Sequence, residues 1–297
     1  MNKEICVVLG FDMETDVGSF TPFYEGLKNG TPKILRLLRK KKVDATFFFT
    51  GEAAQKFPRI VKEVASSGYE VGCHTMYHET VGEEIFEIPG IRPILPEEVP
   101  LRLKMATEVV SNVLGEKTVS FRCPRLFGST TVVNTLNDMG YAADASYPLY
   151  FHKRRFIPYH PSRLNWCEEG NLDILEIPNF ADMTIKSKDR YGRDRDQWPI
   201  FRTKGSDKLM VHINNFLGLV HGKGLPAVLC FYFHPWEFVK MKDIFHFGEA
   251  TVIPDKFITK NCGEYALGEL EKLIERLKEL NAKFYSAKNL AKYWKNR

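Results

Sequence analysis

Residues 43–78 read VDATFFFTGEAAQKFPRIVKEVASSGYEVGCHTMYH. The apolar run 43–50 predicts a buried strand, residues 52–67 carry apolar side chains at helical spacing, and residues 69–73 predict a second strand. Gly68 follows the helical stretch, where glycine is a common cap. A strand, a helix and a strand in direct succession predict two parallel strands joined by a right-handed crossover.

The same alternation extends in both directions along the chain. A strand over residues 5–11 and a helix beginning at Thr31 and Pro32 come before this segment. After it, the pattern predicts helices over 97–114, 130–139, 207–221 and 264–280, and strands over 119–123, 141–145, 172–177, 227–233 and 283–286. The fold class is therefore α/β, and about seven strand–helix units favour a barrel over an open sheet.

Length and composition indicate one globular domain spanning residues 1–297. Of these 297 residues 27% are charged, and the formal net charge of +5 is too small to indicate a nucleic-acid surface. Residues 150–205 interrupt the alternation and are interpreted as a long loop insertion that forms a lid or a wall of a binding site.

Targeting and redox signals indicate a cytoplasmic protein. Residues 1–9 lack the apolar stretch and cleavage site of a signal peptide, and no apolar run reaches the length of a membrane span. The six cysteines show no CxxC spacing and no disulfide-framework density, so we expect reduced thiols.

His74 and His78 form the clearest chemical signal. They follow the strand 69–73 directly and are four residues apart, so a helical turn would bring both imidazoles to one ion. Neutral imidazole suits zinc, iron, cobalt or nickel better than magnesium or calcium. Taken alone, the pair is more often two unconnected loop residues.

A cluster of acids, Asp12, Glu14 and Asp16, follows the first strand. On an extended chain Asp12 and Glu14 point to the same face. One carboxylate could complete a metal site with two histidines while the other acts as a general base. The alternative is a solvated acidic turn.

Three more polar groups lie at the ends of predicted strands or just after them. Arg122 could hold a carboxylate through its fork, Asp144 is an acid at a strand end, and His234 emerges from the apolar segment 227–233. Individually, a surface arginine and a structural histidine are the more common interpretations. In a parallel barrel, however, the carboxyl ends of all strands open on one face, where active sites are built.

This ordered set resembles the polysaccharide deacetylases, carbohydrate esterase family four. The resemblance covers residues 7–238 and is most specific over Glu70-Val71-Gly72-Cys73-His74-Thr75-Met76-Tyr77-His78. It implies a distorted (β/α)7 barrel and one divalent metal, zinc, held by Glu14, His74 and His78. It also implies that Asp12 is the general base and that Arg122 orients it. The spacing Asp-x-Glu-x-Asp leaves open whether Glu14 or Asp16 is the third ligand, and Glu14 is preferred.

For the remaining motifs, the resemblance implies that His234 is the general acid and that Asp144 holds its imidazole. A backbone N–H near Tyr147 would stabilise the oxyanion. We expect Tyr147 and Trp236 to contact the substrate.

The expected reaction is metal-dependent deacetylation of an N-acetylated amino sugar or glycoconjugate. The segment His234-Pro235-Trp236-Glu237 is also similar to allantoinase-like enzymes, so a cyclic amide or ureide substrate is the second hypothesis. A catalytically inactive carbohydrate-binding barrel is the third. Expected partners are a carbohydrate or small amide substrate and further copies of the chain in a homo-oligomer, with no nucleic acid and no membrane span.

Overall fold

The computed structural model describes residues 4–297 of the chain, and the first three residues of the segment searched for a signal peptide lie outside them. The strands are β1 (Ile5–Met13), β2 (Thr46–Phe49), β3 (Glu70–Cys73), β4 (Ser120–Phe121), β5 (Ala143–Asp144), β6 (Leu175–Glu176), β7 (Ala227–Phe233), β8 (Phe245–Phe247), β9 (Ala250–Val252) and β10 (Lys283–Phe284). The α-helices are α1 (Thr31–Lys41), α2 (Gly51–Lys56), α3 (Pro58–Ser66), α4 (Val99–Leu114), α5 (Thr130–Asp138), α6 (Leu149–His152), α7 (Ile200–Thr203), α8 (Ser206–Gly222), α9 (Lys256–Thr259), α10 (Glu264–Glu279) and α11 (Ala287–Lys295). Five shorter turns of helix are η1 (Gly26–Gly30), η2 (Pro96–Glu98), η3 (Pro124–Leu126), η4 (Arg193–Arg195) and η5 (Pro235–Phe238).

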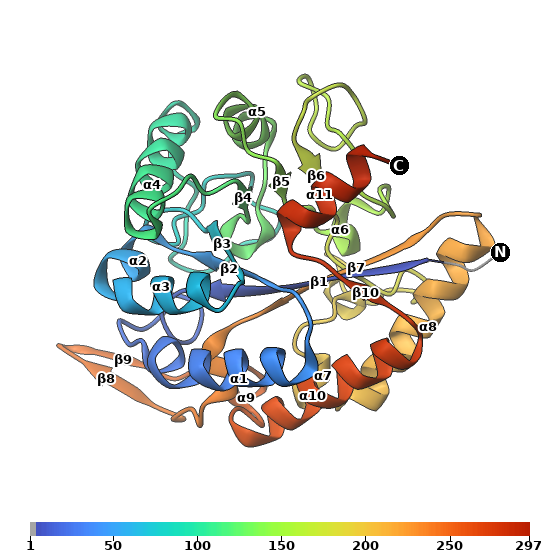
Figure 1. Cartoon of the computed structure of the whole chain (residues 1–297). Helices are drawn as coiled ribbons and strands as arrows, with labels where there is room; N and C mark the ends of the chain where they lie inside the picture. Colours follow the sequence, from blue (N-terminus) through green and yellow to red (C-terminus); the bar gives the residue numbers. More distant parts are fainter. Residues whose placement is uncertain (1–3) are drawn as a thin grey trace.

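A curled parallel sheet forms the centre of the molecule, and helices surround it (Figure 1). Strands β1 to β6 follow one another in chain order, and β7 pairs with β1 along its full length. The short strand β10 pairs with the first half of β1, and β2 pairs with the second half. The α/β class and the barrel-like architecture predicted from the sequence are thus confirmed.

The gap between β6 and β7 is closed by a single residue. The backbone of Asn179 forms bridges with Pro148 on one side and Cys230 of β7 on the other. The N–H of Phe180 donates to the carbonyl of Cys230 at 2.8 Å. The barrel is therefore complete but distorted, because its last two strands are joined by one bridge and not by a ladder.

Side chains fill the barrel, and α11 closes its base. Cys6, Val8, Phe48, Ala143, Ala145, Leu175, Ile177, Val228 and Cys230 form an interior cluster with Ala287 and Leu290 of α11. Below this cluster, the buried carboxylate of Glu70 accepts hydrogen bonds from Thr46, Ser120 and the N–H of Lys288. These hydrogen bonds fix the start of α11 to this end of the barrel. The opposite end, where the parallel strands terminate, remains available for a functional site.

Two predicted elements differ from the structure. The predicted helix 52–67 is two helices, α2 and α3, that meet at Phe57, because the residue before Pro58 is excluded from helical geometry. The stretch 150–205, interpreted as a loop insertion, also contains α6, η4 and α7, while β6 falls within the strand predicted over 172–177.

The hairpin of β8 and β9 extends from the body of the molecule (Figure 1). Neither of its strands was predicted from the sequence. Among residues 4–297, no helix combines the length and the apolar composition needed to cross a bilayer.

Candidate active site

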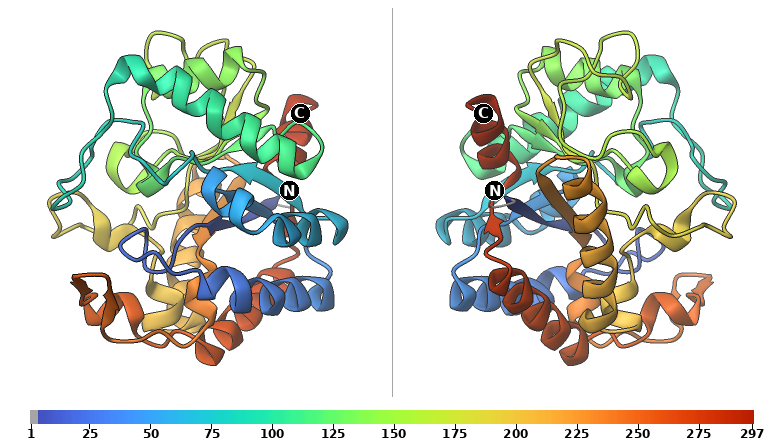
Figure 2. Two further views of the ribbon diagram at one scale, coloured as in Figure 1. Left: turned by 90° about the vertical axis from the view of Figure 1, so that its left-hand side faces the viewer. Right: turned by 90° about the vertical axis from the view of Figure 1, so that its right-hand side faces the viewer.

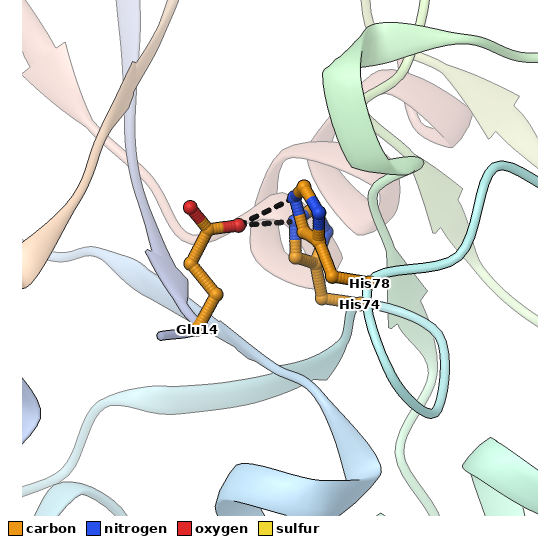
Figure 3. Close-up of side chains that lie close together, drawn as sticks. All are labelled: Glu14, His74 and His78. Atoms are coloured by element: carbon orange, nitrogen blue, oxygen red, sulfur yellow. Dashed lines mark ion pairs between the residues drawn. The ribbon is translucent and has the colours of Figure 1, made fainter. Parts of the chain in front are cut away.

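Glu14, His74 and His78 lie together at the carboxyl end of the sheet (Figure 3). Glu14 follows β1, and both histidines follow β3. The carboxylate oxygen Oε2 of Glu14 lies 2.5 Å from Nε2 of His78 and 3.5 Å from Nε2 of His74. One ligand atom from each residue lies within 4.8 Å of the other two, so the three could hold one metal ion.

A loop, and not the helical turn expected from the spacing, brings the two imidazoles together. Thr75 and His78 both have positive φ angles, of 62° and 61°, which reverse the chain between the two ring positions. Left-handed backbone at residues other than glycine is strained and is retained where the surrounding structure enforces it. The ring centroids of His74 and His78 are 5.1 Å apart.

Each imidazole has its other nitrogen held by an oxygen. Nδ1 of His74 lies 2.7 Å from the carbonyl oxygen of Arg122, and Nδ1 of His78 lies 2.9 Å from Oγ of Ser19. In metal sites such partners fix the tautomer and orient Nε2 toward the ion. Both carboxylate oxygens of Glu14 and Nε2 of His74 are buried without a hydrogen-bond partner. These orphaned atoms fit a cation with nitrogen and oxygen ligands.

The protonation states suit metal ligation. Burial alone would raise the pKa of Glu14, but the neighbouring His78 and His74 hold it well below its ordinary value. Burial lowers the pKa of His78. The groups therefore favour a carboxylate and neutral imidazole, the forms that bind a metal.

Asp16, the other acid considered as a third metal ligand, binds backbone N–H groups and does not face the histidines. Its two carboxylate oxygens accept hydrogen bonds from the N–H groups of Glu25 and Gly26, each at 2.8 Å. It therefore fixes the chain before η1, while Glu14 is the acid that faces the histidines.

Arg122 occupies the barrel axis and holds Asp12. Its guanidinium is fully buried, and Nη1 donates to Oδ1 of Asp12 at 2.9 Å while Nε donates to the carbonyl of Ala145 at 3.1 Å. Gly10 makes room for it, because a Cβ at this position would lie 2.2 Å from Nη1. The sequence-based pairing of Arg122 with Asp12 is thus present in the structure.

This close approach predicts that Gly10→Ala displaces the Arg122 fork and disturbs the Asp12 carboxylate. We expect the free energy of unfolding to fall by roughly 1–3 kcal/mol from overpacking, with a loss of activity that exceeds the loss of folded protein. Urea unfolding followed by circular dichroism, together with initial rates on the folded fraction, measures both. Gly68→Ala is not a suitable control because Gly68 has a φ of 85°, whereas Gly218→Ala, in α8 and with open space around it, is. Equal stability of Gly10→Ala and Gly218→Ala would contradict the role given to Gly10.

His234 is held by Glu237, which corrects the predicted pairing with Asp144. Nδ1 of His234 lies 3.0 Å from Oε1 of Glu237, and Oε2 of the same carboxylate accepts from Nε of Arg202 at 2.8 Å. Nε2 of His234 points the other way and lies 3.9 Å from Oε1 of Glu14. Burial opposes protonation, but the hydrogen bond to Glu237 and the charges of Glu14 and Glu237 raise the pKa of His234 to about 8.

Asp144 pairs instead with Glu176 inside the sheet. Both are fully buried, and burial raises the pKa of Asp144 to about 7 and that of Glu176 well above its ordinary value. Two neighbouring carboxyl groups that are both buried are most stable when they share one proton. Asp144 also accepts a hydrogen bond from Ser146. It is a neighbour of Arg122 and not of His234.

Tyr147 is also placed differently from its prediction. Its side chain is buried against His152, Tyr159 and Trp166. Its backbone N–H donates to Oε1 of Glu176 at 2.8 Å, so it is not free to bind an oxyanion. The buried Glu176 carboxylate explains the difference, because it must be satisfied by backbone donors of this turn.

A cavity of about 350 Å³ opens above these groups. Asp12, Glu14, His78 and His234 line it, and so does Trp236, which is stacked on His234 with ring centroids 5.1 Å apart. Arg193 and Trp198, from the stretch predicted to be a lid or wall, also contribute to its lining. Predicted residues from β1, β3 and β7 therefore meet at one cavity.

The sequence interpretation missed Glu237, Arg202, Ser19 and Arg125 as parts of the site. Arg125 donates to the carbonyl oxygen of His78 at 2.9 Å and to Oγ of Ser19 at 3.1 Å, so it braces the loop that carries a candidate ligand. Glu237 could have been found from its spacing of three residues after His234, because Pro235 favours a turn that brings such residues together. Arg202 and Ser19 carry no local signal, since their partners are far away in sequence.

Comparisons with known proteins agree with the fold and the motifs. The family model for polysaccharide deacetylase matches residues 2–143. The chain is similar to a peptidoglycan-N-acetylglucosamine deacetylase of Bacillus cereus, with 49% identity over 53 residues, which are 18% of this chain and 19% of the relative. It is also similar to a chitooligosaccharide deacetylase of Azorhizobium caulinodans, with 29% identity over 111 residues, 37% of this chain and 48% of that relative. The matched stretches thus cover less than half of the length of these relatives.

Solved structures share the architecture over the whole chain. A probable polysaccharide deacetylase from Pseudomonas aeruginosa PAO1 superposes with a TM-score of 0.66 at 13% identity and covers 100% of this chain and 92% of its own. At this identity the similarity concerns the fold alone. The family model over residues 2–143 and the curated relatives thus show that the first half of the chain is similar to polysaccharide deacetylases, and the solved structure shows the same fold over the whole chain.

Proposed function

We propose that the protein is a metal-dependent amide hydrolase that removes the acetyl group from an N-acetylated amino sugar. The observation that supports the proposal is that three candidate metal ligands, a carboxylate held by Arg122 and a histidine lie around one cavity. The names of the similar deacetylases support an N-acetylated sugar as the substrate class. Glu14, His74 and His78 would hold the metal, and zinc suits this set of one oxygen and two nitrogen ligands.

When bound, the metal would polarise the acyl oxygen and make water a better nucleophile. Asp12 lies in the same cavity and, because Arg122 fixes one of its oxygens, is oriented to accept a proton from the attacking water. His234 faces the cavity with Nε2 and donates a proton to the amine nitrogen as the carbon–nitrogen bond breaks. Glu237 keeps the imidazole in the orientation and protonation state that this step requires.

The role of Glu237 predicts a change in the pH profile. The folded-state pKa of His234 is raised to about 8, so the acid form is present below this pH and is lost as the pH rises through it. In Glu237→Gln the amide oxygen still accepts a hydrogen bond from Nδ1 of His234. The negative charge is gone, however, so less remains to oppose the lowering of the His234 pKa by burial. We expect the alkaline limb of the kcat profile to move to lower pH by about one unit. Steady-state rates between pH 5 and 10 with acetate detection measure the shift.

A purely structural role of Glu237 would lower the rate at every pH and leave the limb in place, which would contradict the assignment. Glu275→Gln, on the exposed face of α10, is the matched control because its carboxylate pairs with Lys41 at the surface. We expect no shift in that variant.

Acetate release by the metal-loaded and the metal-stripped protein tests the proposal itself. Turnover of N-acetylated sugars that is lost on stripping and restored by zinc is the expected result. Ureide hydrolysis that survives stripping would favour the allantoinase-like hypothesis, and sugar binding without turnover under any metal would favour an inactive barrel.

A further inference from the structure

A ring of side-chain contacts, linked to one another by short stretches of chain, joins the segments that line the cavity. On one side, Oγ of Ser19 accepts a hydrogen bond from Arg125 at 3.1 Å. Two residues further along, Phe127 packs against Phe86, with ring centroids 5.1 Å apart. The loop after β1, the turn η3 and the segment before η2 are thus joined in succession.

The ring continues through the residues before α7. The guanidinium of Arg193 lies 5.0 Å from the centroid of the Phe86 side chain. Tyr191 packs on the same phenyl group, with aromatic centroids 5.8 Å apart. In both views of Figure 2 the segment near residue 86 lies beside the segment near residue 191. Two long excursions from the barrel therefore meet over one side of the site.

The β8–β9 hairpin and the helix after it complete the circuit. Trp198 packs against Phe257 of α9 at 6.0 Å. Phe245 and Phe247 of β8 pack on Phe23 at 6.0 and 5.9 Å. Phe23 lies four residues after Ser19, so the contacts return to the loop where they began.

Each side of this ring contributes to the cavity wall. The lining residues from the five segments are Phe20, Arg125, Phe86, Arg193, Trp198 and Phe257. A polysaccharide that crosses an active site needs an open groove with an exit on either side, and segments that are linked to one another around the cavity would obstruct such exits. The volume of about 350 Å³ falls within the range of sites that enclose small molecules.

On this basis, and resting on the proposed function, we infer that the site accepts one N-acylated amino sugar, free or at the end of a chain, and excludes the internal units of a polymer. The ring of contacts is the feature that sets this specificity. The reacting sugar enters end-on, and the rest of a chain remains outside the mouth.

A length series of N-acetylglucosamine oligomers, from the monomer to the hexamer, tests the inference with the full chain loaded with zinc. We expect one acetate released per chain whatever its length, and tandem mass spectrometry should place the free amine on a terminal unit. Acetate per chain that rises with length, or a free amine on an internal unit, would overturn the inference and leave the deacetylase function intact. No acetate from any member, including the monomer, would overturn both.

Phe86→Ala opens the ring at its contact with Arg193 and should raise the acetate released per hexamer above one. Phe156→Ala removes a similar contact, with Lys223 at 5.7 Å, away from the cavity lining and should leave the value at one. A value of one in both variants would show that the ring does not exclude internal units.

Discussion

Replacing Glu14 with glutamine is expected to abolish metal binding and amide hydrolysis together. Glutamine keeps the shape of the side chain but removes the charge that lies between Nε2 of His74 and Nε2 of His78. Loss of a supporting partner of a metal ligand costs roughly 10- to 100-fold in metal affinity, and we expect loss of the ligand itself to cost more. Competition for zinc with a chromophoric chelator measures the affinity, and acetate release measures the activity.

Asp16→Asn is the matched control, because it makes the same change of charge two residues further along. Asp16 accepts hydrogen bonds from two backbone N–H groups and does not face the histidines. We expect a less stable protein whose folded fraction binds zinc with unchanged affinity. Zinc binding that weakens in Asp16→Asn and persists in Glu14→Gln would show that the ligand had been wrongly chosen.

Replacing Asp12 with asparagine is expected to lower kcat by roughly 100- to 10,000-fold, the contribution typical of a general base. Asparagine retains an oxygen for Arg122 but cannot take a proton from water. The zinc content should stay at the level of the unchanged protein, because Asp12 is not one of the three candidate ligands. Metal analysis and steady-state kinetics on the same preparation separate the two quantities.

The stability of this variant must be measured as well. Arg122 is fully buried and would lose its charged partner, and breaking a buried ion pair costs about 3–5 kcal/mol. Asp144→Asn serves as the control for a buried acid near Arg122 that does not line the cavity. We expect its kcat, per folded molecule, to remain within a few-fold of the original. A similar loss in both variants would indicate that the charge around Arg122, and not a proton acceptor, limits the reaction.

The main architecture could be predicted because its signals are local. The apolar runs of β1, β2 and β7 and the helical periodicity of α4, α8 and α10 are set by burial on one face or both, which the sequence records directly. Closure of the barrel depends on Asn179 joining two distant segments, and no local pattern contains that information. The hairpin β8–β9 pairs neighbouring residues, but its strands are only three residues long and it packs on Phe23, which is distant in sequence.

The candidate site was predictable to the extent that its residues follow strands. Asp12, Glu14, His74, His78, Arg122 and His234 each come after or at the end of a predicted strand, and the parallel sheet brings them to one edge. The predicted pairing of His234 with Asp144 was wrong. Asp144 also lies at the end of a strand, but the buried carboxyl group of Glu176 lies beside it and pairs with it instead. Spacing indicates which side chains reach the same edge, but pairing there depends on which charges are desolvated together.

The pairing of β1 with β7 also bears on how the chain is made. Strand β1, which leads to Asp12 and Glu14, leaves the ribosome before the other strands of the barrel, but its seven-residue ladder with β7 needs residues 227–233. The plug of the barrel floor, α11, comes later still. During synthesis the edge of β1 that will pair with β7 thus stays unpaired, and its interior side chains stay uncovered, while more than two hundred further residues are made. Contacts so distant in sequence form slowly. A nascent chain of this kind depends on protection of that edge, by a chaperone or by neighbouring helices, until its seventh strand emerges.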